Sequence, residues 1–223
     1  MEIAKIGDIE VLVGRDAEYL QVNDISEEKL REILPLIRRE YAGFKIMLCY
    51  HNSIAPDVYL REISAELVDN AKEMRLSPRS LSRALSEDDR ILPENADFAV
   101  HLIDEGNFDV FAKFHDVYNP DIYWTSSRIR EKPDIWRIHA YAENNKISGF
   151  IMVMSDYEVF SVAAANSLQS KRLMAVAAAD AFTRGSSQIM YMADKTDTVN
   201  TEAASDVGFA ECGFYKGYRL PQN

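Results

Sequence analysis

Residues 146–185 read KISGFIMVMSDYEVFSVAAANSLQSKRLMAVAAADAFTRG. Two runs rich in apolar and β-branched residues, 147–154 and 157–162, flank a Ser-Asp pair, a pattern typical of two strands joined by a tight turn. Asn166 can cap the helix that follows, whose apolar residues cover most of its circumference, so we expect that helix to be buried. Gly185 can take the left-handed conformation that ends such a helix, and a further apolar run, 188–193, follows at once.

This order of elements predicts a strand–helix–strand crossover at the centre of a sheet. The sequence therefore predicts an α/β protein of the α+β kind, with a mixed sheet. The loop between the 157–162 strand and the helix directs several backbone N–H groups toward one point, where the positive end of the helix dipole also lies. Such a loop favours a phosphate group.

Composition excludes several classes of function. The 223 residues carry a net charge of −11, which argues against a nucleic-acid partner because phosphate binding needs a basic surface. That charge fits a cationic amine substrate or simply a well-solvated surface. No apolar run reaches the roughly 18–20 residues of a membrane span, and the charged start MEIAKIGDIEV does not resemble a secretory signal. Cys49 and Cys212 show no metal-ligand spacing, so we expect no metal, no disulfide framework and a cytoplasmic location.

The remaining chain predicts further elements on either side of this crossover. Strands within 2–23, a helix from Ser26 and a strand at 44–50 come first, followed by a helix whose stripe comprises Leu60, Ile63, Leu67, Ala71 and Met74. After a polar stretch come a strand at 97–103, a helix capped by Asn107, a short helix at 123–130 and a strand at 136–142. We expect an N-terminal α/β extension at 1–95 and a second domain at 96–223.

The first 50 residues repeat the hairpin, helix and strand order of the central stretch. A partial internal repeat explains this order, and an unrelated α/β appendage remains the alternative.

The stretch after the crossover resembles a known superfamily. Residues 197–220 read DTVNTEAASDVGFAECGFYKGYRL, with Gly208-Phe209 before the last strand, and ENNKISG at 143–149 is similar to a turn of the type D-G-K-I-V-G. Over residues 96–220 this order resembles the GNAT superfamily of acetyl-CoA-dependent N-acyltransferases. The resemblance implies a GNAT-like fold for 96–223 and makes 1–95 a candidate partial GNAT-like repeat.

The resemblance also implies acetyl-CoA as co-substrate. The backbone at Val162, Ala163 and Ala164 would hold the pantetheine arm and polarise the thioester carbonyl. The segment that would hold the pyrophosphate comprises Leu168, Gln169, Ser170, Lys171, Arg172 and Leu173. The family pattern has glycines in this segment and this chain has none, so the alternative is a capped, buried helix that exposes two basic residues.

The catalytic candidates come from the same resemblance. Glu158 lies where family members place a glutamate that accepts the amine proton through water, and strand alternation puts it on one face with Phe160 and Val162. Ala204 stands where the family has its tyrosine acid, so Tyr215 and Tyr218 on the last strand are the candidate substitutes.

The resemblance therefore implies an N-acetyltransferase acting on a small-molecule or peptide amine. The alternatives are a catalytically inactive GNAT-fold module that binds or regulates, and an intramolecular pseudo-dimer with a structural N-terminal lobe. A homodimer through an exposed sheet edge is also open. The gap between the strands at 157–162 and 188–193 discriminates between these functions, because side chains such as Phe160 or Leu168 filling it would exclude acyl transfer.

Overall fold

The computed structural model describes residues 2–92, 100–120, 122–143 and 146–222. They divide into two compact units, which we call unit 1 (Met1–Ala71 with Gly213–Asn223) and unit 2 (Lys72–Cys212). The predicted boundary between residues 95 and 96 lies outside the described residues.

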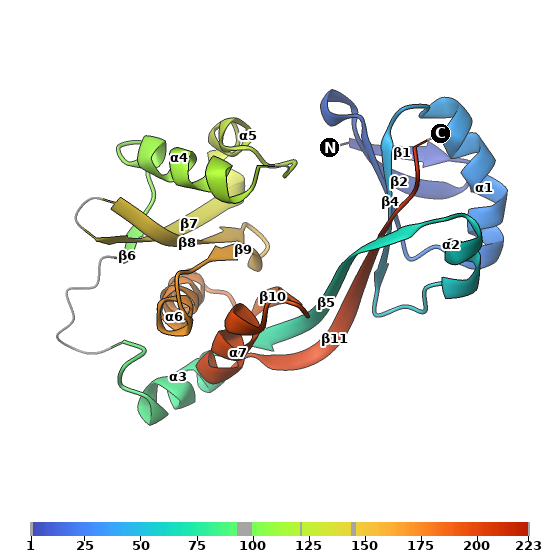
Figure 1. Ribbon diagram of the computed structural model, residues 1–223. Helices are drawn as coiled ribbons and strands as arrows, with labels where there is room; N and C mark the ends of the chain where they lie inside the picture. Colours follow the sequence, from blue (N-terminus) through green and yellow to red (C-terminus); the bar gives the residue numbers. More distant parts are fainter. Residues whose placement is uncertain (1, 93–99, 121, 144–145, 223) are drawn as a thin grey trace. The chain divides into compact units, whose positions relative to one another are not determined.

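Unit 1 is a small sheet covered by helices. Its elements are β1 (Glu2–Ile6), β2 (Ile9–Gly14), the 3-10 turn η1 (Arg15–Ala17), β3 (Tyr19–Asn23), α1 (Glu27–Glu40), β4 (Lys45–His51) and α2 (Asp57–Glu62). β1, β2 and β3 are antiparallel, β4 runs parallel to β3, and β11 (Ala210–Arg219) pairs antiparallel with β4. Buried side chains of α1 and α2 form one apolar core with these strands, and Figure 1 shows both helices on the same face.

Unit 2 contains the central stretch. Its elements are α3 (Pro78–Glu87), β6 (Val100–Leu102), α4 (Phe108–Tyr118), α5 (Ser126–Arg130), η2 (Pro133–Ile135), β7 (Trp136–Glu143), β8 (Lys146–Met154), β9 (Glu158–Ala163), α6 (Ser167–Thr183), β10 (Ile189–Asp194) and α7 (Thr198–Val207). Its strands lie in the order β5-β10-β9-β8-β7-β6, where β5 is Glu66–Leu76. β10 runs parallel to β9 and the pairs from β6 to β9 are antiparallel, so the predicted α/β class with a mixed sheet is confirmed.

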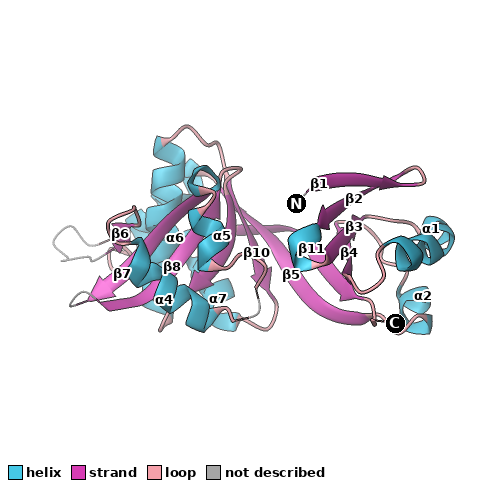
Figure 2. Cartoon of the chain, turned by 90° about the horizontal axis from the view of Figure 1, so that it is seen from above, coloured by secondary structure: helices cyan, strands magenta, loops and turns pink. Residues whose placement is uncertain are grey.

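Helices cover both faces of the strands of unit 2. Figures 1 and 2 show α6 on one face and α4 with α5 on the other. One apolar core lies between the sheet and the helices α3, α6 and α7, and a second lies under α4 and α5. The helix α6 is apolar around most of its circumference because it packs on the strands and on α7 as well.

The local signals around α6 are confirmed. The side chain of Asn166 accepts a hydrogen bond from the N–H of Gln169 at 2.9 Å, which is the expected N-terminal cap. Gly185, just past the end of the helix, has a φ of +94°, a left-handed conformation that glycine adopts without steric cost.

The predicted helix over 56–74 is wrong beyond its first turns. α2 ends at Glu62, Ser64 has a φ of +58°, and β5 begins at Glu66. Ala71 and Met74 are buried as predicted, but as strand residues. The segment is rich in good helix formers, and their weak local preference is overridden when strand pairing and burial are available on a sheet.

The same order of elements occurs twice along the chain. Three antiparallel strands, a helix, a parallel strand, a short helix and a long strand run from β1 to β5 and again from β7 to β11. The last strand of each series, β5 or β11, has one part in unit 1 and one part in unit 2. A common origin of the two series remains a prediction.

Candidate functional site

The two parallel strands at the centre of unit 2 pair over a short distance only. β9 and β10 are in register at Glu158 with Met190 and at Val159 with Tyr191, and their pairing ends there. The later residues of β9 remain paired with β8 on its other side, where Val162 lies opposite Ile151. One backbone edge of β9 beyond Val159 therefore lacks a strand partner, and N–H and C=O groups on such an edge can bind an extended ligand.

Unit 1 shows the opposite arrangement at the equivalent strands. β3 and β4 pair along all of β3, from Tyr19 with Lys45 to Asn23 with Cys49. The edge that β9 leaves unpaired is thus closed in unit 1, and the candidate site belongs to unit 2.

A β-bulge in β9 changes which side chains share a face. The β8–β9 register shifts between Met152, which faces Ser161, and Val153, which faces Val159. Phe160 is the extra residue, and its ring lies 5.2 Å from that of Trp136 on the α4 and α5 side. Val162 instead belongs to the core on the α6 side. The expected alternation that puts Phe160 and Val162 on one face is therefore wrong, because one inserted residue reverses the side-chain period of a strand.

The loop between β9 and α6 is held by Gln169. Its Oε1 accepts a hydrogen bond of 2.5 Å from the Ala165 N–H, and its Nε2 donates to Ser148 Oγ at 2.9 Å. The side chain is almost fully buried. Gln169 therefore fixes the loop to β8 and occupies one loop N–H that would otherwise be available to a phosphate.

Gly149 on β8 makes room for this glutamine. A Cβ at residue 149 would lie 2.6 Å from Ala163 O and 2.9 Å from Gln169 Oε1, distances that real side chains do not tolerate. The glycine is required here by the close approach of β9 and of the amide group, since its φ is not in the left-handed region.

A cavity of about 240 Å³ lies at the N-terminus of α6. Its lining comprises Tyr141, Ser148, Ala165, Asn166, Leu168, Gln169 and Arg172. In the first turn of α6, the Gln169 N–H donates to the Asn166 side chain and the Ser170 N–H to the Asn166 carbonyl, whereas Ser167 and Leu168 have no earlier carbonyl within the helix to bind. The positive end of the helix dipole points the same way. Three residues predicted to contact the cofactor, Leu168, Gln169 and Arg172, are brought together here, and Leu168 keeps 38% of its surface exposed.

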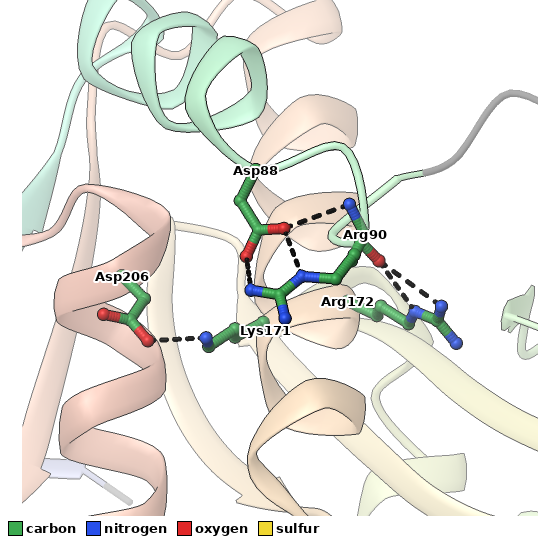
Figure 3. A network of polar contacts seen from close by, with 5 residues as sticks. All are labelled: Asp88, Arg90, Lys171, Arg172 and Asp206. Carbon is green, nitrogen blue, oxygen red and sulfur yellow. Dashed lines mark hydrogen bonds and ion pairs between the residues drawn. The ribbon is translucent and has the colours of Figure 1, made fainter.

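The two basic residues of the segment have different partners, as Figure 3 shows. Lys171 Nζ lies 2.6 Å from Asp206 Oδ2, so its charge is neutralised within the protein. Arg172 donates from Nε and Nη2 to the carbonyl oxygen of Arg90, at 3.3 Å each, and from Nη1 to the Tyr141 hydroxyl at 3.5 Å. These bonds orient the guanidinium beside the cavity.

The chain segment that carries the Arg90 carbonyl is itself ordered by an ion pair. Arg90 Nε and Nη2 donate to the two carboxylate oxygens of Asp88 at 2.7 and 2.8 Å (Figure 3). These hydrogen bonds lower the pKa of Asp88 to about 2. The segment after α3 therefore positions Arg172 on α6 through a carbonyl that the ion pair holds in place.

Asn200 of α7 reaches the unpaired edge of β9. Its Nδ2 donates to Val162 O at 3.3 Å and to Asp197 Oδ2 at 2.6 Å, and its Oδ1 accepts from Ser170 Oγ at 2.6 Å. Asn200 and Ser170 are both buried. Sequence reasoning missed Asn200, although Asp197 three residues before it marks the start of a helix next to the crossover strand.

Other predicted residues lie outside the lining of this cavity. Ser170 and Leu173 are fully buried on α6, and Ala204, where the family has a tyrosine, lies in the same core. Glu158 stands at the start of β9, two residues before the bulge.

The two candidate tyrosines belong to unit 1. Tyr215 donates from its hydroxyl to Cys49 Sγ at 2.9 Å, and Tyr218 donates to Asp57 Oδ1 at 2.7 Å. Burial raises the pKa of both hydroxyls, and the hydrogen bond to Asp57 raises that of Tyr218 further. Both tyrosines are therefore protonated at neutral pH, and their catalytic role remains a prediction.

Across residues 2–92, 100–120, 122–143 and 146–222, no group of three or more His, Cys, Asp or Glu side chains is placed to hold a metal ion. Among the helices of the same ranges, none is long and apolar enough to cross a membrane.

Comparison with known proteins shows which folds this chain resembles. No protein-family model and no curated protein sequence matches the chain. Among solved structures, it is similar to a GCN5-related N-acetyltransferase from Kribbella flavida, with 14% identity and a TM-score of 0.68 over 100% of this chain and 90% of that one. A functionally unknown conserved protein from Staphylococcus epidermidis is similar at 12% identity and a TM-score of 0.67, over 96% and 91% of the two chains.

A third solved structure is also similar to this chain. It is a tandem GNAT protein from the clavulanic acid biosynthesis pathway, 9% identical, with a TM-score of 0.58 over 96% of this chain and 78% of that one. Together these likenesses define the class of fold: the chain has the fold of the GCN5-related N-acetyltransferases. The resemblance expected from residues 96–220 is confirmed at that level.

Proposed function

We propose that the chain is an N-acetyltransferase that transfers an acetyl group from acetyl-CoA to the amine of a small molecule or peptide. One observation carries the proposal: β9 and β10 stop pairing after Val159, at a site where an N-terminal helix end and a cavity also lie. A fold can be kept for many purposes, but an unpaired edge inside a sheet needs a partner for its backbone groups.

The residues present fit the co-substrate. Backbone groups at Val162, Ala163 and Ala164 would bind the pantetheine arm along the edge of β9. The first turn of α6 and Arg172 would attract the pyrophosphate, and Leu168 would cover it at the cavity mouth. Acetyl-CoA, when bound, supplies an acyl group activated as a thioester.

Glu158 is the base that we assign to the reaction. It would accept the proton that the attacking amine loses, through a water molecule, while the new C–N bond replaces the C–S bond and the departing sulfur takes up one proton.

A second function is favoured by a specific observation. Gln169 occupies the Ala165 N–H, and Asn200 occupies the Val162 carbonyl, so two backbone groups that the co-substrate would use are already bonded. Together with the buried Ala204 in place of a tyrosine, this arrangement also suits a module that binds a ligand without transferring a group.

Thermal unfolding with acetyl-CoA tests the first function, with CoA and ATP as controls. A ligand at about 100 times its dissociation constant stabilises by about 2.7 kcal/mol, which raises the midpoint by several degrees in a chain of this size. A rise with acetyl-CoA and CoA but not with ATP is expected, and release of free thiol in a screen of amines would then identify acceptors. No rise at millimolar acetyl-CoA would refute co-substrate binding.

We further propose a cytoplasmic location, where acetyl-CoA is available.

A further inference from the structure

One face of β9 is already filled beside the edge that lacks a strand partner. On the α6 and α7 side, the buried side chains of Ser170 and Asn200 hydrogen-bond to each other, and Asn200 also donates to Val162 O. Ala204 is fully buried in the core on the same side. An acyl group bound at this edge could extend toward α6 or α7 only by displacing packed side chains, which is costly. The acyl group therefore has to extend on the other face of the sheet, toward α4.

Aromatic side chains of α4 cover that other face. Phe150 of β8 pairs with Ala163 of β9, and both side chains belong to the core under α4 and α5. The ring of Tyr118, the last residue of α4, lies edge-on to Phe150 with 5.8 Å between the centroids, and it is stacked on Phe114 at 6.4 Å. The Phe114 ring in turn lies 5.9 Å from that of Phe150. The three rings therefore hold one another in place beside Ala163.

Tyr118 also lies near the point where β9 and β10 separate. Burial raises the pKa of the Tyr118 hydroxyl, and the carboxylate of Asp197 raises it further. The same carboxylate raises the pKa of Tyr191, for which burial is again the larger cause. Tyr191 is the last residue of β10 that pairs with β9, and Asp197 is the N-terminal cap of α7 that also accepts from Asn200. Tyr118 is therefore a neutral side chain beside this opening, and 50% of its surface remains exposed to contact a ligand.

We propose that Tyr118 is a specificity-determining residue whose ring limits the acyl group of the co-substrate to acetyl. The inference rests on the proposed function, and it adds which thioester the site accepts. With the thioester carbonyl at the backbone of residues 162–164, the acetyl methyl reaches no further than the exposed side of the Tyr118 ring. A hexanoyl chain would have to push that ring off Phe114 and Phe150, so it binds well only when the ring is removed.

Thermal unfolding at increasing concentrations of CoA, acetyl-CoA and hexanoyl-CoA gives the affinity for each ligand without an acceptor amine. We expect CoA and acetyl-CoA to bind alike. Hexanoyl-CoA should bind about tenfold more weakly, which lies within the range that overpacking a filled site supports.

Three variants separate the ring from its hydroxyl and from its surroundings. Tyr118→Ala should bind hexanoyl-CoA about tenfold more tightly than the unchanged protein does, while its affinity for CoA stays the same. Tyr118→Phe keeps the ring and should still discriminate against the longer chain. Val117→Ala changes the neighbouring residue, whose side chain is exposed, and should behave as the unchanged protein.

Two results would overturn this proposal while leaving the proposed function intact. These are equal affinities of the unchanged protein for acetyl-CoA and hexanoyl-CoA, or no gain in hexanoyl-CoA affinity in Tyr118→Ala, in either case with CoA bound. If neither CoA nor any thioester stabilised the chain, the proposed function would fail and this proposal with it, so the two failures are distinguishable.

Discussion

The buried pair of Ser170 and Asn200 offers a direct test of how the edge of β9 is stabilised. Asn200→Ala removes the donor to Val162 O and the acceptor of the Ser170 hydroxyl. An unsatisfied buried polar group costs about 1–3 kcal/mol, so we expect a loss of about 2 kcal/mol. For a chain of this size that loss lowers the melting temperature by roughly 4–8 °C.

Ser170→Ala leaves Asn200 Oδ1 without the hydroxyl, at a cost of about 1 kcal/mol. The double variant lacks both the Ser170 hydroxyl and the Asn200 oxygen that accepts from it, so neither of these two polar groups is left buried without its partner. We therefore expect the double variant to lose less than the sum of the single variants, with a coupling of about 1 kcal/mol. Urea unfolding of the four proteins measures this coupling. Additivity within about 0.3 kcal/mol would show that the two side chains do not depend on each other and would refute the reasoning.

Three further outcomes are expected. Gly149→Ala should destabilise the fold, because its Cβ would meet Ala163 O at 2.6 Å; an unchanged urea midpoint would contradict that contact. Burial lowers the pKa of His139 to about 4, so the unfolded chain binds the proton first as the pH falls from about 6.5. The stability that the neutral imidazole provides is present above pH 6.5 and lost toward pH 4, so His139→Gln should flatten this slope in pH-dependent unfolding. Arg172→Ala should weaken the binding of acetyl-CoA several-fold in the thermal assay. If the variant bound acetyl-CoA as tightly as the unchanged protein, Arg172 would not contact a phosphate group.

The sequence predicted the parts of the fold in which local signals and burial agree. The hairpin, the cap at Asn166, the apolar α6 and the glycine after it all point to one crossover, and the structure has it. The stretch from Leu67 to Met74 shows where such reasoning stops. Its residues prefer a helix, and only the neighbouring strands, distant in the chain, make it a strand.

The candidate site was predictable in position but not in chemistry. The loop before α6 follows from the order of elements, since a helix that leaves a central strand collects N–H groups there. Its missing glycines appeared to be the main obstacle to a phosphate. In the structure the decisive residue is Gln169, whose amide group holds the loop through Ala165 and Ser148. No spacing rule reveals this contact, because it depends on Gly149, which lies 20 residues earlier on another strand.

The two repeats of the element order show what distinguishes a site from its scaffold. β3 and β4 of unit 1 and β9 and β10 of unit 2 occupy the same place in the order, and both pairs are joined by a capped helix. β3 pairs with β4 along its whole length, whereas β9 pairs with β10 only as far as Val159. The bulge at Phe160 lies directly after the last residue of β9 that pairs with β10, and a bulge increases the local twist of its strand. The inserted residue in β9 therefore gives a physical reason for the strands to part, and we expect its deletion to restore pairing with β10 at the expense of any ligand on that edge.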